Sequence, residues 1–126
     1  MRSGQTVSSI GDVNGDSFGD LLISVVGAQK INDTAATSTR GQTNNTRGAA
    51  VIVFGWNQTQ EPREWFKEWS LWDMADGVRG IRIDGPTETS RFGSFVGGVG
   101  DVNGDYLDDF VIGGANIKQV FLFWGR

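Results

Sequence analysis

Two short acidic loops contain the residues of this chain whose types and spacing could do chemistry. Side-chain oxygens stand at the first, third, fifth and ninth positions of each loop. In the first loop they belong to Asp12, Asn14, Asp16 and Asp20. In the second loop they belong to Asp101, Asn103, Asp105 and Asp109. Carboxylate and amide oxygens are the donors that hard cations select, so each loop predicts one cation site.

Calcium suits these loops better than magnesium does. Calcium accepts about six to eight oxygen ligands in flexible geometry, whereas magnesium prefers a rigid octahedron that retains several waters. A backbone carbonyl near the seventh position belongs to Phe18 in the first loop and Leu107 in the second. With a bidentate carboxylate at the ninth position the donor count reaches about six, and water completes the shell. The sequence therefore predicts two Ca²⁺ sites.

Two alternatives compete with this interpretation. An EF-hand loop requires Gly at the sixth position and Glu at the twelfth, but the first loop has Ser17 and Ile23 there and the second has Tyr106 and Ile112. Strand-forming residues also follow both loops, where an EF-hand requires a helix. The other alternative is a metal-free turn rich in Asn, Asp and Gly. Its crowded carboxylates would repel one another with no basic residue nearby in sequence, which favours a structural cation.

Composition excludes several functional classes. The 126-residue chain has 15 acidic and 11 basic residues, a formal net charge of −4 and a pI of about 4.6. Six of the acidic residues are the predicted ligands, and no basic stripe occurs, so nucleic-acid binding is not expected. The absence of Cys and His excludes disulfides, the usual zinc sites and Ser-His-Asp or Cys-His catalysis.

The chain is built from an internal repeat of predicted β-strands. A constant offset aligns Asp12 with Asp101, and it also aligns the segments before and after each loop. The apolar runs are rich in β-branched and aromatic residues and are punctuated by glycine, which is typical of strands. They comprise 21–26, 50–55, 110–114 and 120–125, and an alternating segment at 79–84 adds an outer strand. Strands that are apolar on both faces are buried on both sides, which predicts stacked sheets.

Two segments interrupt the repeat. Residues 30–47 are rich in Thr, Asn and Ser and are predicted to form a long mobile surface loop. Residues 61–76 form a Trp-rich insertion in which Trp65, Trp69 and Trp72 would share one face of a short helix. These tryptophans would cap the sheet edge or, as the alternative, stack on a carbohydrate. Glycosylation sequons occur at Asn32, Asn44 and Asn57, and random occurrence in polar loops explains them equally well.

Together these motifs resemble the FG-GAP repeat of integrin α-chain-like β-propellers. The opening Phe-Gly of that family is matched by Phe92-Gly93, and its closing Phe-x-Gly element by Phe54-Gly55 and Trp124-Gly125. Both Asp-x-Asn-Gly-Asp-x-x-x-Asp loops match the calcium motif of the family. Departures are Ser3-Gly4 in place of the first Phe-Gly, the absence of proline after Gly27-Ala28 and Gly114-Ala115, and Ser17 and Tyr106 where the loops usually have Gly.

The resemblance implies an all-β chain made of two four-stranded antiparallel propeller blades. Blade one would span residues 2–84, and blade two would span 85–126 without its outer strand. Because repeat folds generally need about three or more units, we expect a fragment of a longer propeller, a homo-oligomer or a compact two-sheet variant. The implied function is calcium-dependent cell adhesion or ligand recognition at the cell surface or outside the cell. Its partners would be neighbouring repeats, and a protein or glycan ligand.

An enzyme is the weakest of the functional hypotheses. The acids of a glycoside hydrolase would have to be those already assigned to the metal, and no other acid pair lies in a recognisable setting. No apolar run is long enough for a membrane span, and the first residues lack the apolar core of a signal peptide. The sequence therefore predicts a non-catalytic binding module whose ligand it does not specify.

Overall fold

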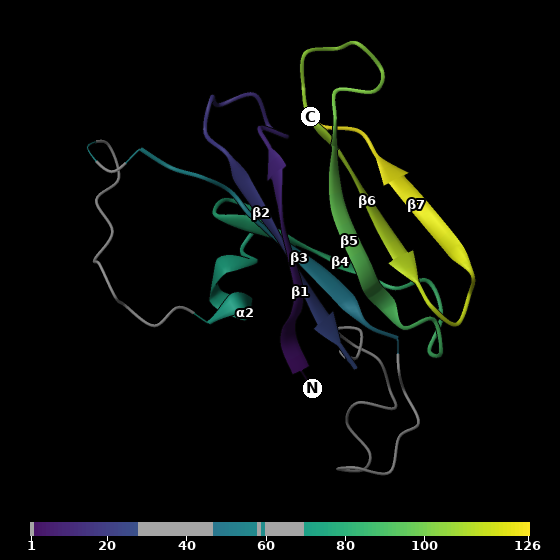
Figure 1. Ribbon diagram of the computed structural model, residues 1–126. Helices are drawn as coiled ribbons and strands as arrows, with labels where there is room; N and C mark the ends of the chain where they lie inside the picture. The colour runs from purple at the N-terminus through teal and green to yellow at the C-terminus, as the bar shows by residue number, and fades with distance from the viewer. Residues whose placement is uncertain (1, 28–46, 58, 60–69) are drawn as a thin grey trace.

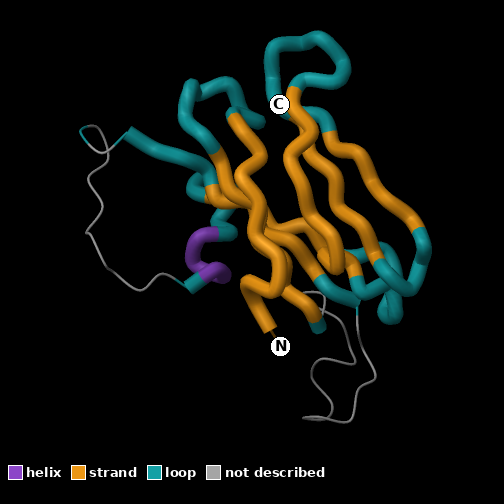
Figure 2. Tube along the Cα trace, viewed as in Figure 1, coloured by secondary structure: helices purple, strands orange, loops and turns teal. Residues whose placement is uncertain are grey.

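The protein is an all-β molecule made of two antiparallel sheets, as the sequence predicts. The computed structural model describes residues 2–27, 47–57, 59 and 70–126. In these residues seven strands and one short helix are present, and the two sheets lie side by side (Figures 1 and 2). The tips of the two acidic loops lie at the same end of the molecule (Figure 1).

The first sheet contains four strands in sequential order. They are β1 (Arg2–Gly11), β2 (Asp20–Val26), β3 (Ala49–Val53) and β4 (Gly80–Asp84), each antiparallel to its neighbour. In the register, Leu22 of β2 lies opposite Ile52 of β3, which lies opposite Ile81 of β4. The expected outer strand over residues 79–84 is therefore confirmed as β4.

The second sheet repeats this arrangement with three strands. They are β5 (Phe92–Gly100), β6 (Asp109–Gly114) and β7 (Gln119–Phe123), again in sequential order. Among the described residues, β7 is the edge strand of this three-stranded sheet. The two acidic loops occupy equivalent places, one between β1 and β2 and the other between β5 and β6.

The main core lies between the two sheets. Strand β5 packs across β1 and β2, so one face of each sheet is buried against the other. Gly98 permits this close approach, because a Cβ atom there would lie 2.7 Å from the carbonyl oxygen of Ser9. Phe110 and Phe123 stack with ring centroids 5.1 Å apart. The buried core residues are Ile10, Val13, Leu22, Ala50, Ile52, Phe92, Phe110 and Ile112.

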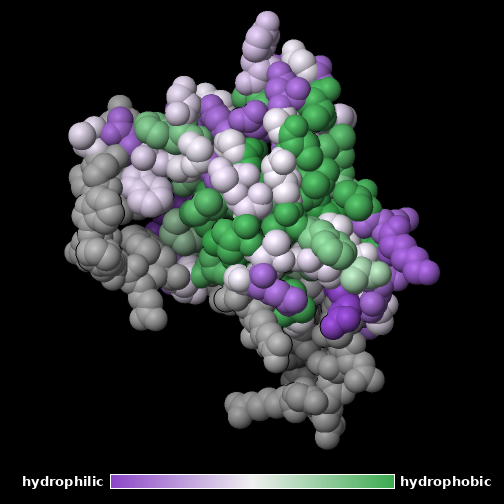
Figure 3. All heavy atoms as spheres, in the orientation of Figure 1, coloured by the Kyte–Doolittle hydropathy of each residue, from purple (hydrophilic) through white to green (hydrophobic). Residues whose placement is uncertain are grey.

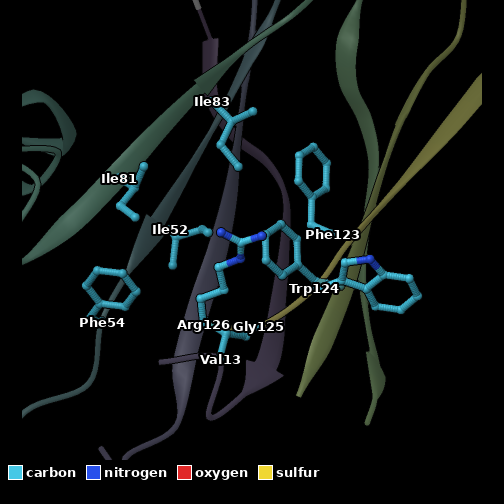
Figure 4. Close-up of a pocket in the computed structure, with 10 residues that line it drawn as sticks. Val13, Ile52, Phe54, Ile81, Ile83, Phe123, Trp124, Gly125 and Arg126 are labelled. Atoms are coloured by element: carbon cyan, nitrogen blue, oxygen red, sulfur yellow. The ribbon is translucent and has the colours of Figure 1, made fainter. Parts of the chain in front are cut away.

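A shallow apolar hollow of about 200 Å³ opens where the sheets diverge. Ile81 and Ile83 of β4 line one side and Phe123 of β7 lines the other, while Arg126 extends between them (Figure 4). Within the described residues no fourth strand of the second sheet faces β4, and this end of the inter-sheet space is open. The lining is almost wholly apolar, so it offers no catalytic constellation.

A second, smaller core lies on the opposite face of the first sheet. The single-turn helix α2 (Leu71–Met74) covers Val25, Ala49 and Val51, which are completely buried. Trp72 falls within α2, but the rest of the expected tryptophan-bearing helix, including Trp65 and Trp69, lies outside the described residues. The predicted surface loop over residues 30–47 also lies outside them, apart from Arg47. No helix in the described segments has the length and hydrophobicity to cross a membrane.

Candidate metal centre

The first loop, residues 12–20, is wrapped around the carboxylate of its first residue. Asp12 Oδ1 accepts hydrogen bonds from the backbone N–H groups of Gly15 at 2.7 Å and Asp16 at 3.1 Å. Asp12 Oδ2 accepts another from Ser17 at 2.7 Å. Farther along, Asn14 Nδ2 donates to Asp16 Oδ2 at 3.0 Å, and the Phe18 N–H donates to Asp16 Oδ1 at 2.8 Å. The first three predicted ligand side chains are thus held on one short turn.

The second loop, residues 101–109, has the same hydrogen-bond network. Asp101 accepts bonds from Gly104 at 2.7 Å, Asp105 at 3.1 Å and Tyr106 at 2.8 Å. Asn103 Nδ2 donates to Asp105 Oδ2 at 3.1 Å, and the Leu107 N–H donates to Asp105 Oδ1 at 3.0 Å. The repeated motif therefore produces one conformation in two different surroundings.

The ninth-position carboxylates differ from the other loop acids because the fold buries them. Asp20 and Asp109 are only 1% and 0% exposed. Asp20 accepts hydrogen bonds from the N–H groups of Val13 at 2.9 Å and Gly55 at 2.8 Å. Asp109 accepts them from Val102 and Gly125, both at 2.9 Å. Each buried carboxylate therefore ties the start of its loop to the chain just after the third strand of its sheet.

This tying role was not predicted, although the sequence contains a signal for it. The closing glycines, Gly55 and Gly125, donate the second hydrogen bond to the buried carboxylates. A Cβ atom at Gly55 would lie 2.4 Å from the Gly19 carbonyl oxygen, and one at Gly125 would lie 2.4 Å from that of Asp108. Only glycine fits such close backbone contacts. The glycine that closes each repeat is therefore part of the loop structure.

The pKa of the buried Asp20 and the pKa of the exposed Asp101 are shifted in opposite directions. Burial raises the pKa of Asp20, the N–H groups of Gly55 and Val13 oppose that rise, and the nearby carboxylates of Asp16 and Asp12 add to it. Desolvation also acts to raise the pKa of Asp101, but the backbone hydrogen bonds led by Tyr106 and Gly104 outweigh it and lower that pKa. The loop amides therefore favour the ionised form that cation binding requires.

The donor set fits a hard cation, but the acidic side chains do not converge on one point. Within the described residues, no three His, Cys, Asp or Glu side chains form a group that could hold a metal ion. The reason is visible in the first loop, where both oxygens of Asp20 face backbone amides while Asp16 is exposed. Carboxylate oxygens have two lone pairs each, so Asp20 and Asp109 retain acceptor capacity beyond these bonds. Phe18 and Leu107, whose carbonyls complete the predicted ligand sets, are half-buried.

Both loops adopt an unfavourable backbone conformation at their sixth residue. Ser17 has φ of 70° and Tyr106 has φ of 69°. These are the two positions at which the resembled family usually has glycine, and the left-handed conformation explains that preference. The side chain of Tyr106 is 96% exposed, so no packing offsets the strain there. Such strain is typical of functional sites, where the surrounding structure holds it in place.

The two loops are joined directly through Asp108. The Asp12 N–H donates to Asp108 Oδ2 at 2.9 Å, and the Asp108 N–H donates to the Asp12 carbonyl oxygen at 3.0 Å. The equivalent residue of the first loop is Gly19, which has no side chain to make the reciprocal contact. Asp108, which directly precedes the last predicted ligand of the second loop, therefore binds the first predicted ligand of the first loop.

We expect Asp108→Ala to lower the free energy of unfolding by about 1 kcal/mol in calcium-free buffer, because the half-buried Asp12 N–H loses its acceptor. Urea denaturation followed by tryptophan fluorescence measures this change. Glu88→Ala is the matched control, since Glu88 is an exposed carboxylate at the tip of the β4–β5 connection. Equal stability of the two variants would show that the loop-to-loop bond contributes nothing.

The other candidate residues that the structure describes form no further site. Asn57, one of the sequon residues, accepts hydrogen bonds from the N–H of Thr59 at 2.9 Å and from its hydroxyl at 2.6 Å. Asn32 and Asn44 lie outside the described residues, as does most of the proposed carbohydrate platform. The acidic loops are therefore the part of the described structure in which chemistry-bearing side chains gather.

Comparison with known proteins adds no further assignment. No protein-family model matches the chain, and no curated protein matches it either.

Proposed function

We propose that this protein is a calcium-binding repeat module of the β-propeller type, with one structural Ca²⁺ in each acidic loop. The observation that carries the proposal is the identical acceptor-rich network of the two loops, built around Asp12 in one and Asp101 in the other. A turn without a binding role has no reason to keep all four side-chain acceptors in both copies. The four- and three-stranded sheets are compatible with two adjacent blades.

The residues of each loop would supply complementary parts of a calcium shell. The turn would supply three side chains and one backbone carbonyl, and the ninth residue would add a buried carboxylate. In the first loop these residues are Asp12, Asn14, Asp16, Phe18 and Asp20. In the second they are Asp101, Asn103, Asp105, Leu107 and Asp109. The cation would supply positive charge where the chain concentrates its acids, and would offset the repulsion that opposes loop closure.

The role of the module would be non-catalytic recognition or adhesion outside the cell. The acids of the two loops are assigned as cation ligands and as acceptors for backbone amides, so they are not available as an acid–base pair for catalysis. Calcium sites of extracellular modules have dissociation constants of about 10⁻⁴ to 10⁻³ M, and loops of such affinity would fill in external calcium and stay empty in resting cytosol. The adhesive role rests on the resemblance to FG-GAP repeats.

Isothermal titration with calcium chloride tests the proposal by counting sites. The wild-type chain should bind two Ca²⁺ ions, whereas Asp16→Ala and Asp105→Ala should each bind one. These two aspartates are exposed, so their removal leaves the hydrogen bonds of the buried carboxylates intact. Glu88→Ala should keep both sites. Absence of heat in the wild type, or two sites in every variant, would reject the assignment.

A further inference from the structure

The outer face of the second sheet is apolar, and no described part of the chain covers it. We call it the open face, and its side chains belong to Phe95, Val99, Val111, Val120, Leu122 and Trp124. Phe95 is 67% exposed and Val120 is 69% exposed. Hydrophobic residues lie exposed over this sheet in the space-filling view (Figure 3), and Trp124 points away from the hollow between the sheets (Figure 4). Contiguous apolar surface of this kind marks an interaction site.

The internal repeat shows what packs on the equivalent face of the first sheet. Leu22 pairs with Ile52 in the first sheet in the same register as Val111 pairs with Leu122 in the second. The open face is therefore the counterpart of the face of the first sheet that packs against β5 and β6. Leu22 and Ile52 are 0% and 4% exposed there, whereas Leu122 is 45% exposed. One face of the repeat is thus covered in the first copy and bare in the second.

A surface suited to cover the open face is present on the first sheet. In the second sheet the covering side chains are Val96, Phe110 and Ile112. Their counterparts by register are Val7, Leu21 and Ile23, on the outer side of β1 and β2. We call these three residues the docking face.

The docking face is accessible along β1 and the start of β2. Val7 is 54% exposed and Leu21 is 44% exposed. Helix α2 covers only the other part of that side of the sheet, around Val25, Ala49 and Val51. The contact between the two sheets of the chain is made mainly by β5 against β1 and β2, so the strand needed for a further contact is β1, the counterpart of β5. None of the residues packed under α2 belongs to β1.

We infer that the open face of one copy of the chain receives the docking face of a second copy. This contact would continue the sheet-on-sheet packing that already joins the two repeats. The two faces are different surfaces, so the assembly is head-to-tail and forms rings or open chains instead of a two-fold dimer. Neither face includes a loop ligand, so the inference does not depend on calcium binding.

Analytical ultracentrifugation of the wild type and two charge variants tests the inference. Val120→Glu disrupts the open face and Val7→Glu disrupts the docking face, and both residues are exposed in the single chain. The wild type should sediment as a concentration-dependent oligomer and each variant as a monomer. Val78→Glu is the matched control, because Val78 is 81% exposed and lies in the turn before β4, away from both faces. Circular dichroism confirms that each variant is folded.

Mixing the two variants makes the test specific for head-to-tail contact. The Val7→Glu copy keeps an intact open face and the Val120→Glu copy keeps an intact docking face, so an equimolar mixture should form heterodimers and nothing larger. A monomeric wild type at all concentrations would overturn the inference. Dimers of Val7→Glu alone would overturn it in favour of contact between two open faces. Oligomers of both separate variants would overturn it in favour of pairing at the β7 edge.

Discussion

Calcium is expected to raise the free energy of unfolding by about 2.7 kcal/mol for each loop when its concentration is one hundred times the dissociation constant. Two filled loops would therefore add roughly 5 kcal/mol, which is comparable to the whole stability of many single domains. The reason is mass action, since calcium would bind the folded loops, whose turns are fixed by hydrogen bonds to Asp12 and Asp101, and not the unfolded chain. Urea denaturation in saturating calcium and in EDTA measures the difference.

Two controls make this prediction specific. Magnesium at the same concentration should give a much smaller increase, because the flexible, water-poor shell that the loops offer suits calcium better. The double variant Asp16→Ala/Asp105→Ala should lose the calcium effect while keeping most of its calcium-free stability, since both side chains are exposed. An unchanged urea midpoint on adding calcium to the wild type would mean that the loops are turns held by their own amides.

The strands were predictable because their signal is local. Each apolar run between turn residues, such as Ala49–Val53 and Asp109–Gly114, became a strand with ends close to those expected. The outer strand β4 was also foreseen from the alternation of residues 79–84. Periodicity and turn chemistry act over a few residues, so a single sequence contains enough information to place them.

The different roles of the buried and the exposed loop acids were not predictable. Spacing alone made Asp20 and Asp109 ligands equivalent to the others, but the fold buries them and turns both oxygens of each carboxylate to backbone amides. One donor in each case comes from a glycine after the third strand, far along the chain. Asp108 was overlooked for the same reason, because its partner Asp12 belongs to the other repeat. Contacts between distant segments leave no periodic trace in sequence.

The unequal exposure of the two repeats also emerged only in three dimensions. Val111 and Leu22 are equivalent by sequence and register, and nothing local distinguishes their surroundings. Leu22 is buried because a second sheet follows in the chain and packs on it, whereas no sheet of the described chain packs on Val111. Sequence repetition thus predicts which faces can pack together, while the fold decides which of them is covered in the described chain.

Removal of either buried carboxylate should destabilise the protein more than removal of any exposed loop acid. Asp20→Ala leaves the buried N–H of Val13 and the part-buried N–H of Gly55 without their acceptor. Asp109→Ala does the same to the buried N–H of Gly125 and the part-buried N–H of Val102. An orphaned buried donor costs about 1 to 3 kcal/mol and a part-buried one costs less, so each variant should lose roughly 2 to 4 kcal/mol. Urea denaturation in EDTA measures this loss without any contribution from bound cation.

Asp16→Ala is the matched control for this prediction, because it removes an exposed carboxylate from the same loop. It should cost well under the loss of Asp20→Ala in EDTA, although both variants should weaken calcium binding. Asp20→Asn keeps one acceptor oxygen and turns the other into a donor that faces an N–H group, so its stability should fall between the wild type and Asp20→Ala. Equal calcium-free stability of Asp20→Ala and Asp16→Ala would contradict the structural role of the buried carboxylate. The expected order would instead establish that the ninth loop position holds the repeat together before any metal binds.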